Sequence, residues 1–216
     1  MAGIVFSVGM LILGFGFYFD QPLYTDSVGT IRQHFVDNAD TLPVADWFGA
    51  VLFVGAFLLF ATVLRTVLGA ADTDETWPRL SFAGSVISVA VAGSGVFLAT
   101  FALGDLADLS DSTIVAMVRA DALLYTVILP FGFALFVGAA SLSVLRAASF
   151  PKWVGWFGLV SALTLVIGSL WPVQDDPEGF LAILGMIGFI AAMIWVLVVG
   201  IIMTGVGRPA EQSGHE

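Results

Sequence analysis

Long apolar runs separated by short polar connections make up most of the chain. A run of about 18 or more apolar residues without charges is typical of a membrane-spanning helix, because a bilayer core of about 30 Å needs about 20 helical residues. The runs do not alternate apolar and polar residues as the strands of a membrane barrel do. The pattern therefore predicts an all-α polytopic membrane protein, a bundle of six transmembrane helices near residues 2–19, 47–65, 80–104, 121–145, 153–171 and 180–205.

The first connection, residues 20–46, is polar yet has a helical period of its own. Its apolar residues recur at three- and four-residue spacings: Val28, Ile31, Phe35 and Ala39. This spacing predicts a short amphipathic helix on the outer membrane surface, between the first two spanning helices. Pro43 is expected to break the chain after it, and Asp46 to be the N-cap residue of the second spanning helix.

The third and fourth runs contain residues that bear on packing. The third run has small residues at four-residue spacings, as at Gly84, Ser88 and Ala92. Small residues let helix backbones approach closely in a membrane, so helix 80–104 is expected to lie centrally in the bundle. The fourth run contains Pro130, whose missing backbone N–H predicts a kink in helix 121–145.

Composition narrows the class of protein further. Hydrophobic residues make up 59% of the 216 residues and charged residues 11%, whereas an ordinary soluble domain has roughly 25% charged residues. Cysteine is absent, which excludes disulfides, thiolate metal sites, iron–sulfur ligation and cysteine nucleophiles. One transmembrane domain over residues 1–208 accounts for nearly the whole chain, and residues 209–216 are expected to form a disordered cytoplasmic tail.

Charged residues divide between the two sides of the predicted membrane. The connections on one side hold five basic residues and those on the other side hold two: Arg65, Arg79, Arg146, Lys152 and Arg208 against Arg32 and Arg119. Short cytoplasmic loops have the excess of lysine and arginine, so both termini are expected in the cytoplasm, with the protein in the plasma membrane of a bacterium or archaeon. Most of the 17 acidic residues then face outwards, where they repel nucleic acid, although simple solvation accounts for such charge runs too.

The middle of the predicted spans lacks ionisable side chains. No Asp, Glu, Lys, Arg or His stands there, although ion and proton pathways normally need such groups. A charge-coupled pump and an intramembrane protease are therefore disfavoured. Core hydroxyls such as those of Ser88 and Thr126 more often bond to helix carbonyls than catalyse. We expect no catalytic residue, no metal ion and no cofactor.

Ionisable side chains gather instead at the predicted outer ends of the helices. The candidate ligand-binding residues of an outer pocket are Arg32, His34, Asp46, Arg119, Asp121 and Tyr125. Asp121 and Tyr125 are one turn apart in helix 121–145, above the kink expected at Pro130. The alternative interpretation is that these residues form ion pairs that tie the outer loops to the helix ends.

A distinctive sequence pattern lies between residues 129 and 168. An apolar helix and a short basic turn are followed by an entry into the next helix that consists of Pro151, Lys152 and Trp153, with Gly158 further on. In this pattern the chain resembles, over about its last half, the bacterial multi-pass membrane proteins of the family called domain of unknown function 4386. The resemblance implies six helices and no known activity.

These observations lead to three functional hypotheses. The first is a non-enzymatic membrane protein, either a scaffold or a binder of a lipid-like small molecule within the helix bundle. The second is a carrier for an uncharged lipophilic compound, and the third is an enzyme at the outer face that uses Asp121, His34 or Asp46 as acid or base. The expected partners are membrane lipid, a lipophilic small molecule, and another membrane protein or a second copy of the chain.

Overall fold

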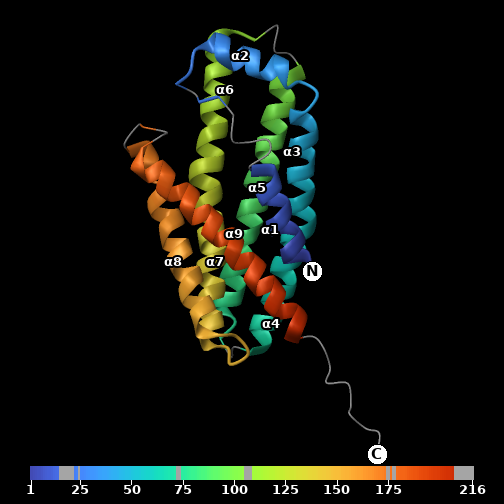
Figure 1. Ribbon diagram of the computed structural model, residues 1–216, viewed down its shortest axis with the longest axis vertical. Helices are drawn as coiled ribbons and strands as arrows, with labels where there is room; N and C mark the ends of the chain where they lie inside the picture. Colours follow the sequence, from blue (N-terminus) through green and yellow to red (C-terminus); the bar gives the residue numbers. More distant parts are fainter. Residues whose placement is uncertain are drawn as a thin grey trace, which may run out of the picture.

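The computed structural model is an elongated bundle of helices (Figure 1). It describes residues 1–14, 22–23, 25–71, 74–104, 109–173, 176 and 179–206, without the side chains of residues 95–104 and 206. The described helical elements, with η for π- and 3₁₀-helical turns, are α1 (Ala2–Leu13), α2 (Val28–Asp37), α3 (Leu42–Val51), η2 (Leu52–Phe57), α4 (Leu58–Ala71), α5 (Thr76–Gly104), α6 (Asp111–Leu123), η3 (Leu124–Ile128), α7 (Leu129–Arg146), α8 (Lys152–Gly168), η4 (Trp171–Val173) and α9 (Phe180–Val206). None of the described residues forms a β-strand, so the all-α prediction is confirmed.

Among the described residues, four helical stretches are long and apolar enough to cross a membrane, and they make this a multi-pass membrane protein. They are Leu42–Ala71, Asp111–Arg146, Lys152–Val173 and Phe180–Gly205. The helices predicted over residues 2–19 and 80–104 are present as α1 and α5. Residues 15–19 of the first prediction lie outside the described residues, as does the predicted tail at 209–216.

Helix α5 packs against α7 at very short range, as its small residues predict. A Cβ atom added to Gly84 would lie 2.5 Å from the backbone N of Phe136 and 2.7 Å from the carbonyl O of Gly132. The Ser81 hydroxyl donates a hydrogen bond of 2.9 Å to the carbonyl O of Phe136. The backbones of α5 and α7 can approach so closely only because residue 84 has no side chain.

Aromatic rings from four elements fill the centre of the bundle. The Phe6 ring of α1 stacks on Phe57 of η2 with centroids 4.6 Å apart. Phe57 contacts Phe136 of α7 edge to face at 4.9 Å, and Phe136 contacts Trp195 of α9 at 6.1 Å. All four side chains have no exposed surface. Such offset and edge-to-face contacts add to the gain from burial, so this column joins the first helix to the last.

The helices that follow the first and third connections begin earlier than the hydropathy pattern predicts. Helix α3 begins at Leu42, and Pro43 lies in its first turn, where the missing N–H costs no hydrogen bond. The expected break at Pro43 and N-cap at Asp46 are therefore wrong, and Asp46 is a buried residue inside the helix. Helix α6 begins at Asp111 after an N-cap at Ser110, whose hydroxyl accepts from the Thr113 N–H. The predicted start near residue 121 is the point where the continuous helix becomes apolar.

The helix around Pro130 has a local irregularity where the kink was predicted. A π-helical turn, η3, ends just before α7, and Pro130 lies in the first turn of α7. A proline clashes with the carbonyl four residues earlier and cannot bond to it, and π-turns are a common response to such disruption. The indole N–H of Trp171 in η4 donates to the Thr126 hydroxyl of this turn at 2.8 Å, which ties η3 to the segment just after α8.

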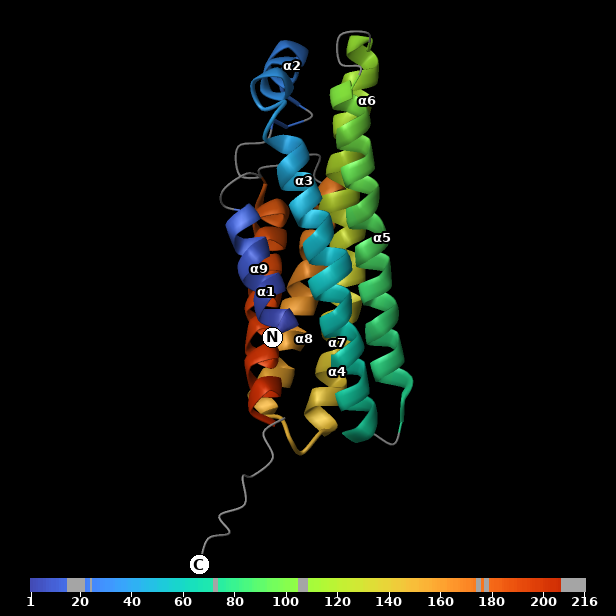
Figure 2. The same cartoon turned by 90° about the vertical axis from the view of Figure 1, so that its right-hand side faces the viewer.

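The predicted amphipathic helix between the first two long helices is present as α2. Its N-cap is Ser27, whose hydroxyl accepts from the Thr30 N–H at 3.1 Å. Ile31 on its inner face has no exposed surface. Figures 1 and 2 show α2 lying across one end of the bundle, while the chain turns from α4 to α5 and from α7 to α8 at the other end.

The contact at Gly84 yields a stability prediction. We expect Gly84→Ala to lower the free energy of unfolding by about 1–3 kcal/mol, because the new methyl group meets backbone atoms that cannot rotate away. Thermal unfolding of the purified protein in detergent measures the change. The matched control is Gly93→Ala in the same helix, where an added Cβ has no neighbour within 4 Å. Equal melting temperatures for the two variants would contradict the close α5–α7 contact.

Candidate functional site

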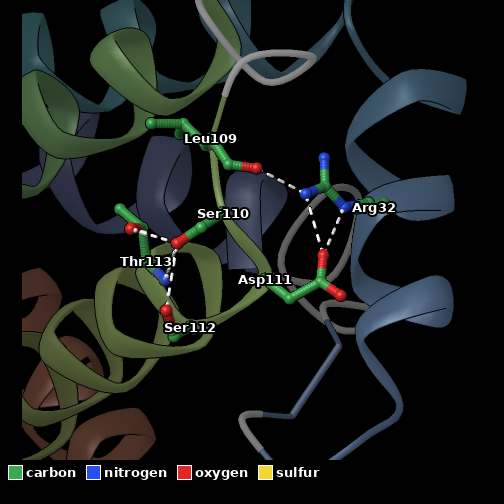
Figure 3. A network of polar contacts seen from close by, with 6 residues as sticks. All are labelled: Arg32, Leu109, Ser110, Asp111, Ser112 and Thr113. Carbon is green, nitrogen blue, oxygen red and sulfur yellow. Dashed lines mark hydrogen bonds and ion pairs between the residues drawn. The ribbon is translucent and has the colours of Figure 1, made fainter.

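Helix α2 is fastened to the start of α6 through Arg32 (Figure 3). The Nε and Nη2 atoms of Arg32 donate to Asp111 Oδ1 at 3.2 and 2.9 Å. Nη2 also donates to the carbonyl O of Leu109 at 2.6 Å. An arginine that bonds a carboxylate and a backbone carbonyl at once fixes the relative position of the two segments. We call this set of contacts the Arg32 clasp.

Asp46, Asp121 and Tyr125 of the predicted outer pocket lie near one another. Asp46 lies in α3, Asp121 in α6 and Tyr125 in η3. The charges of Asp46 and Asp121 are close enough to interact with each other and with Tyr125. The Tyr125 hydroxyl donates to the carbonyl O of Ala92 in α5 at 3.2 Å. This group therefore joins three long helical stretches near the α2 end of the bundle.

Asp46 and Tyr125 line a very small cavity beside this group. Its volume is about 20 Å³, and its other lining residues are Met10, Gly49, Ala50, Phe53 and Ala92. A volume of this size holds about one water molecule, whereas sites for small ligands measure about 300–1,000 Å³. The lining includes Phe53 of η2 and Tyr125 of η3, so both π-helical turns border the same cavity.

The remaining predicted site residues do not line this cavity. The His34 ring on α2 is half-buried and contacts the neighbouring Phe35 ring edge to face at 5.9 Å. Arg119 is exposed on α6. It lies two positions before Asp121, and residues at that spacing do not share a helix face. Among the described residues, no three His, Cys, Asp or Glu side chains are grouped so that they could hold a metal ion.

A ligand-sized cavity is present at the opposite end of the bundle. It is an open groove of about 390 Å³ between α4 and the start of α5, lined by Thr62, Arg65, Thr66, Gly69, Ala70, Glu75, Pro78 and Arg79. We call it the α4–α5 groove. From the sequence, Arg65 and Arg79 indicated only which side of the membrane is cytoplasmic, and this groove was not predicted. The available signal was a pair of arginines on either side of a short turn, with Thr62 and Thr66 one helical turn apart.

The two arginines of the groove differ in their contacts. Arg65 lies with its guanidinium carbon 5.3 Å from the centroid of the Phe82 ring, a cation–π arrangement. Arg79 in α5 forms an ion pair with Glu75, which lies one turn earlier, just before α5 begins. The hydroxyls of Thr62 and Thr66 donate to carbonyls of their own helix, those of Leu58 and Thr62.

A further ion pair stands beside the groove and links the end of α7 to the residues just before α5. Arg146 at the end of α7 lies 3.8 Å from Asp74 and 5.8 Å from the centroid of the Trp77 ring. Hydrogen bonds from the side chain and backbone of Thr76, together with the charge of Arg146, lower the pKa of the Asp74 carboxyl below its usual value. Asp74 is thus held as an anion that neutralises Arg146.

Comparison with known proteins gives one family. The model of the family described as domain of unknown function (DUF4386) matches residues 1–200, so the chain belongs to this family. The match extends the resemblance seen in the second half of the sequence to the segment that contains Arg32 and His34. No curated protein and no solved structure matches the chain.

The Arg32 clasp leads to a prediction about local opening of α2. We expect Arg32→Gln to weaken the attachment of α2 by about 1 kcal/mol, the upper range for a partly exposed ion pair. Backbone hydrogen exchange in α2 should then accelerate about fivefold, and Asp111→Asn should have a similar effect. Hydrogen–deuterium exchange mass spectrometry measures both variants.

The control for the clasp is Asp37→Asn, since among the described residues Asp37 accepts only a local hydrogen bond, from Gln33 on α2. Its exchange rates should match those of the unmodified protein. If Arg32→Gln and Asp37→Asn left α2 equally protected, the clasp would not hold the helix.

Proposed function

We propose that this member of the DUF4386 family is a non-enzymatic plasma-membrane protein with six spans that binds a lipid-like molecule in the α4–α5 groove. The observation that carries the proposal is the groove itself. Its volume of about 390 Å³ falls in the range of small-molecule sites. The sequence suggested a binding site in the interior of the bundle. Because the aromatic column fills that interior, we place the proposed site on the flank of the bundle.

The shape of the surroundings supports an amphiphilic ligand. Exposed apolar side chains continue from the groove toward the middle of the bundle on both helices: Leu59 and Val63 on α4, and Val86 and Ile87 on α5. A ligand with a polar end in the groove would lay an acyl chain along these residues. Apolar surface of this kind interacts with lipid chains at no cost in a bilayer, since both are hydrocarbon.

Six spans are supported by the course of α1 and α5. Helix α5 has 29 residues and runs along the length of the bundle beside α3 and α4 (Figure 2). Helix α1 is apolar and is packed against α9, where an added Cβ on Gly200 would lie 3.4 Å from the backbone N of Ile4. Both helices therefore share the environment of the four long apolar stretches.

The proposed orientation places the α4–α5 groove on the cytoplasmic side. The chain turns from α4 to α5 and from α7 to α8 at one end of the bundle (Figure 2), and the parts of these helices nearest the turns contain Arg65, Arg79, Arg146 and Lys152. Helix α2, which contains Arg32, lies at the opposite end. The positive-inside rule assigns the end rich in lysine and arginine to the cytoplasm. With six spans, both termini are then cytoplasmic.

Because the chain has no cysteine, single introduced cysteines test this orientation. We expect Ser112→Cys, at the α2 end, to react with a membrane-impermeant maleimide in intact cells. Ser149→Cys, in the turn between α7 and α8, should react only after lysis. Both residues are exposed, so accessibility to the reagent is matched. Labelling of Ser149→Cys alone in intact cells would reverse the proposed orientation.

Native mass spectrometry of protein extracted from its own membrane tests lipid binding. We expect one lipid-mass molecule to remain bound at a ratio of about one to one. Gly69→Phe should remove it, because residue 69 lines the groove and has open space for a side chain. The control is Gly55→Phe in the same helical stretch, which also has open space but lies outside the groove. A bare protein, or equal retention by both variants, would refute the proposal.

A further inference from the structure

We propose that the α4–α5 groove selects an anionic phosphate headgroup of a phospholipid, with Arg65 as the principal ligand and Arg79 as the second. This inference rests on the proposed lipid-binding function and adds the chemical class of the ligand. The lining has two arginines and one carboxylate, in a chain whose net charge is −10. The groove is thus a local positive site on an acidic protein.

Arg65 has hydrogen-bonding capacity that the described part of the chain does not use. The Arg65 guanidinium forms a cation–π contact with the Phe82 ring, but no acceptor among the described residues forms a hydrogen bond with it. A guanidinium has five N–H donors in a planar fork that matches phosphate oxygens. The contact with Phe82 engages the cation without occupying these donors, so the fork remains available for an external anion.

Three described basic side chains outside the groove lining have partners within the protein. Arg32 bonds to Asp111, Arg146 is paired with Asp74, and Lys152 donates to the carbonyl O of Leu145. Each of these side chains thus bonds within the protein. Arg65 differs from Arg32 and Arg146 because it lines an open groove and its charge has no carboxylate partner among the described residues. An external anion is therefore the acceptor that its position favours.

Arg79 can join Arg65 in binding the same anion. Its pair with Glu75 uses one nitrogen, Nη2, and the two side chains are 66% and 55% exposed. An ion pair in water contributes only about 0–1 kcal/mol, so a phosphate can share the guanidinium without a large loss. The hydroxyls of Thr62 and Thr66 donate to carbonyls of their own helix. The arginines are therefore the groups that would distinguish an anionic headgroup from a neutral one.

The position of the groove favours a lipid headgroup over a free anion as the source of the phosphate. Basic pockets between helices at the cytoplasmic interface are known places for anionic lipid headgroups. Trp77, the type of residue that is enriched at membrane interfaces, lies one residue from Pro78 of the lining. The apolar side chains of α4 and α5 that continue from the groove give the acyl chains of the same molecule a surface.

The test compares lipids that differ in headgroup charge. Purified protein in detergent is titrated with phosphatidylglycerol and with phosphatidylcholine of the same chain length, and native mass spectrometry gives the affinity ratio. We expect phosphatidylglycerol to bind about tenfold more tightly. Arg65→Gln should reduce this preference to about unity, and Arg65→Lys should keep part of it because the charge is retained.

Arg146→Gln is the matched control, with the same loss of charge at the same end of the bundle but outside the groove lining. Its preference should remain near tenfold. Equal losses in Arg65→Gln and Arg146→Gln would overturn the proposal and point to general electrostatic attraction. Melting temperatures confirm that each variant is folded, which the exposure of both arginines leads us to expect.

A third arm distinguishes lipid from free phosphate. Glycerol phosphate, added as competitor, should not displace phosphatidylglycerol at concentrations up to about a hundredfold above that of the lipid. Displacement at equal concentration would assign the groove to a soluble anion and overturn the lipid assignment. If a lipid is retained in a manner that depends on residue 69 but without preference for anionic headgroups, the charge inference fails while the proposed function stands. If no lipid is retained, the proposed function itself fails.

Discussion

The close contact between α5 and α7 is the constraint on which the rest of the bundle depends. Within a membrane, helices gain little from hydrophobic association, so packing and interhelical hydrogen bonds hold them together. Gly84 lets the two backbones meet, and the Ser81 hydroxyl bonds to the carbonyl of Phe136 across the same interface. With the backbone of α7 fixed at this distance, the ring of Phe136 stands between Phe57 and Trp195. The interior is thereby filled, which is why the proposed ligand site lies on the flank of the bundle and not in its centre.

Sequence analysis predicted the features that depend on short-range pattern. The small residues of α5 indicated its close packing, and the spacing around Ile31 indicated α2. Helix boundaries were predicted less well, because hydropathy measures contact with lipid while a helix such as α6 continues beyond it. The π-helical turns could not be predicted from the sequence. The pentapeptide LFVGA is π-helical at residues 52–56 and α-helical at residues 135–139, so the neighbours of each segment decide its conformation, not its local sequence.

The candidate site was predicted in part, and the reason is spatial. Asp46, Asp121 and Tyr125 come together because α3 and the α6–η3 stretch both pack beside α5. The sequence suggested this grouping because all three residues were expected near the outer ends of helices. The partner of Arg32 was missed because Asp111 was expected to lie in a loop, whereas it begins α6. Arg65 and Arg79 were read only as markers of orientation. Their spacing of 14 positions does not reveal that α4 and α5 place both of them in the lining of one groove.

The arginines at the two ends of the bundle differ in their partners, and this difference favours the end with the α4–α5 groove as the functional one. At the α2 end, Arg32 meets a carboxylate and a carbonyl of the protein itself, which serves architecture. At the other end, Asp74 neutralises Arg146, while Arg65 lies over Phe82 with its donors unbonded to any described residue. Selection for stability alone would place a carboxylate beside such a cation, as it has for Arg79. The lipid phosphate that we propose for the open groove would supply this anion from outside the chain.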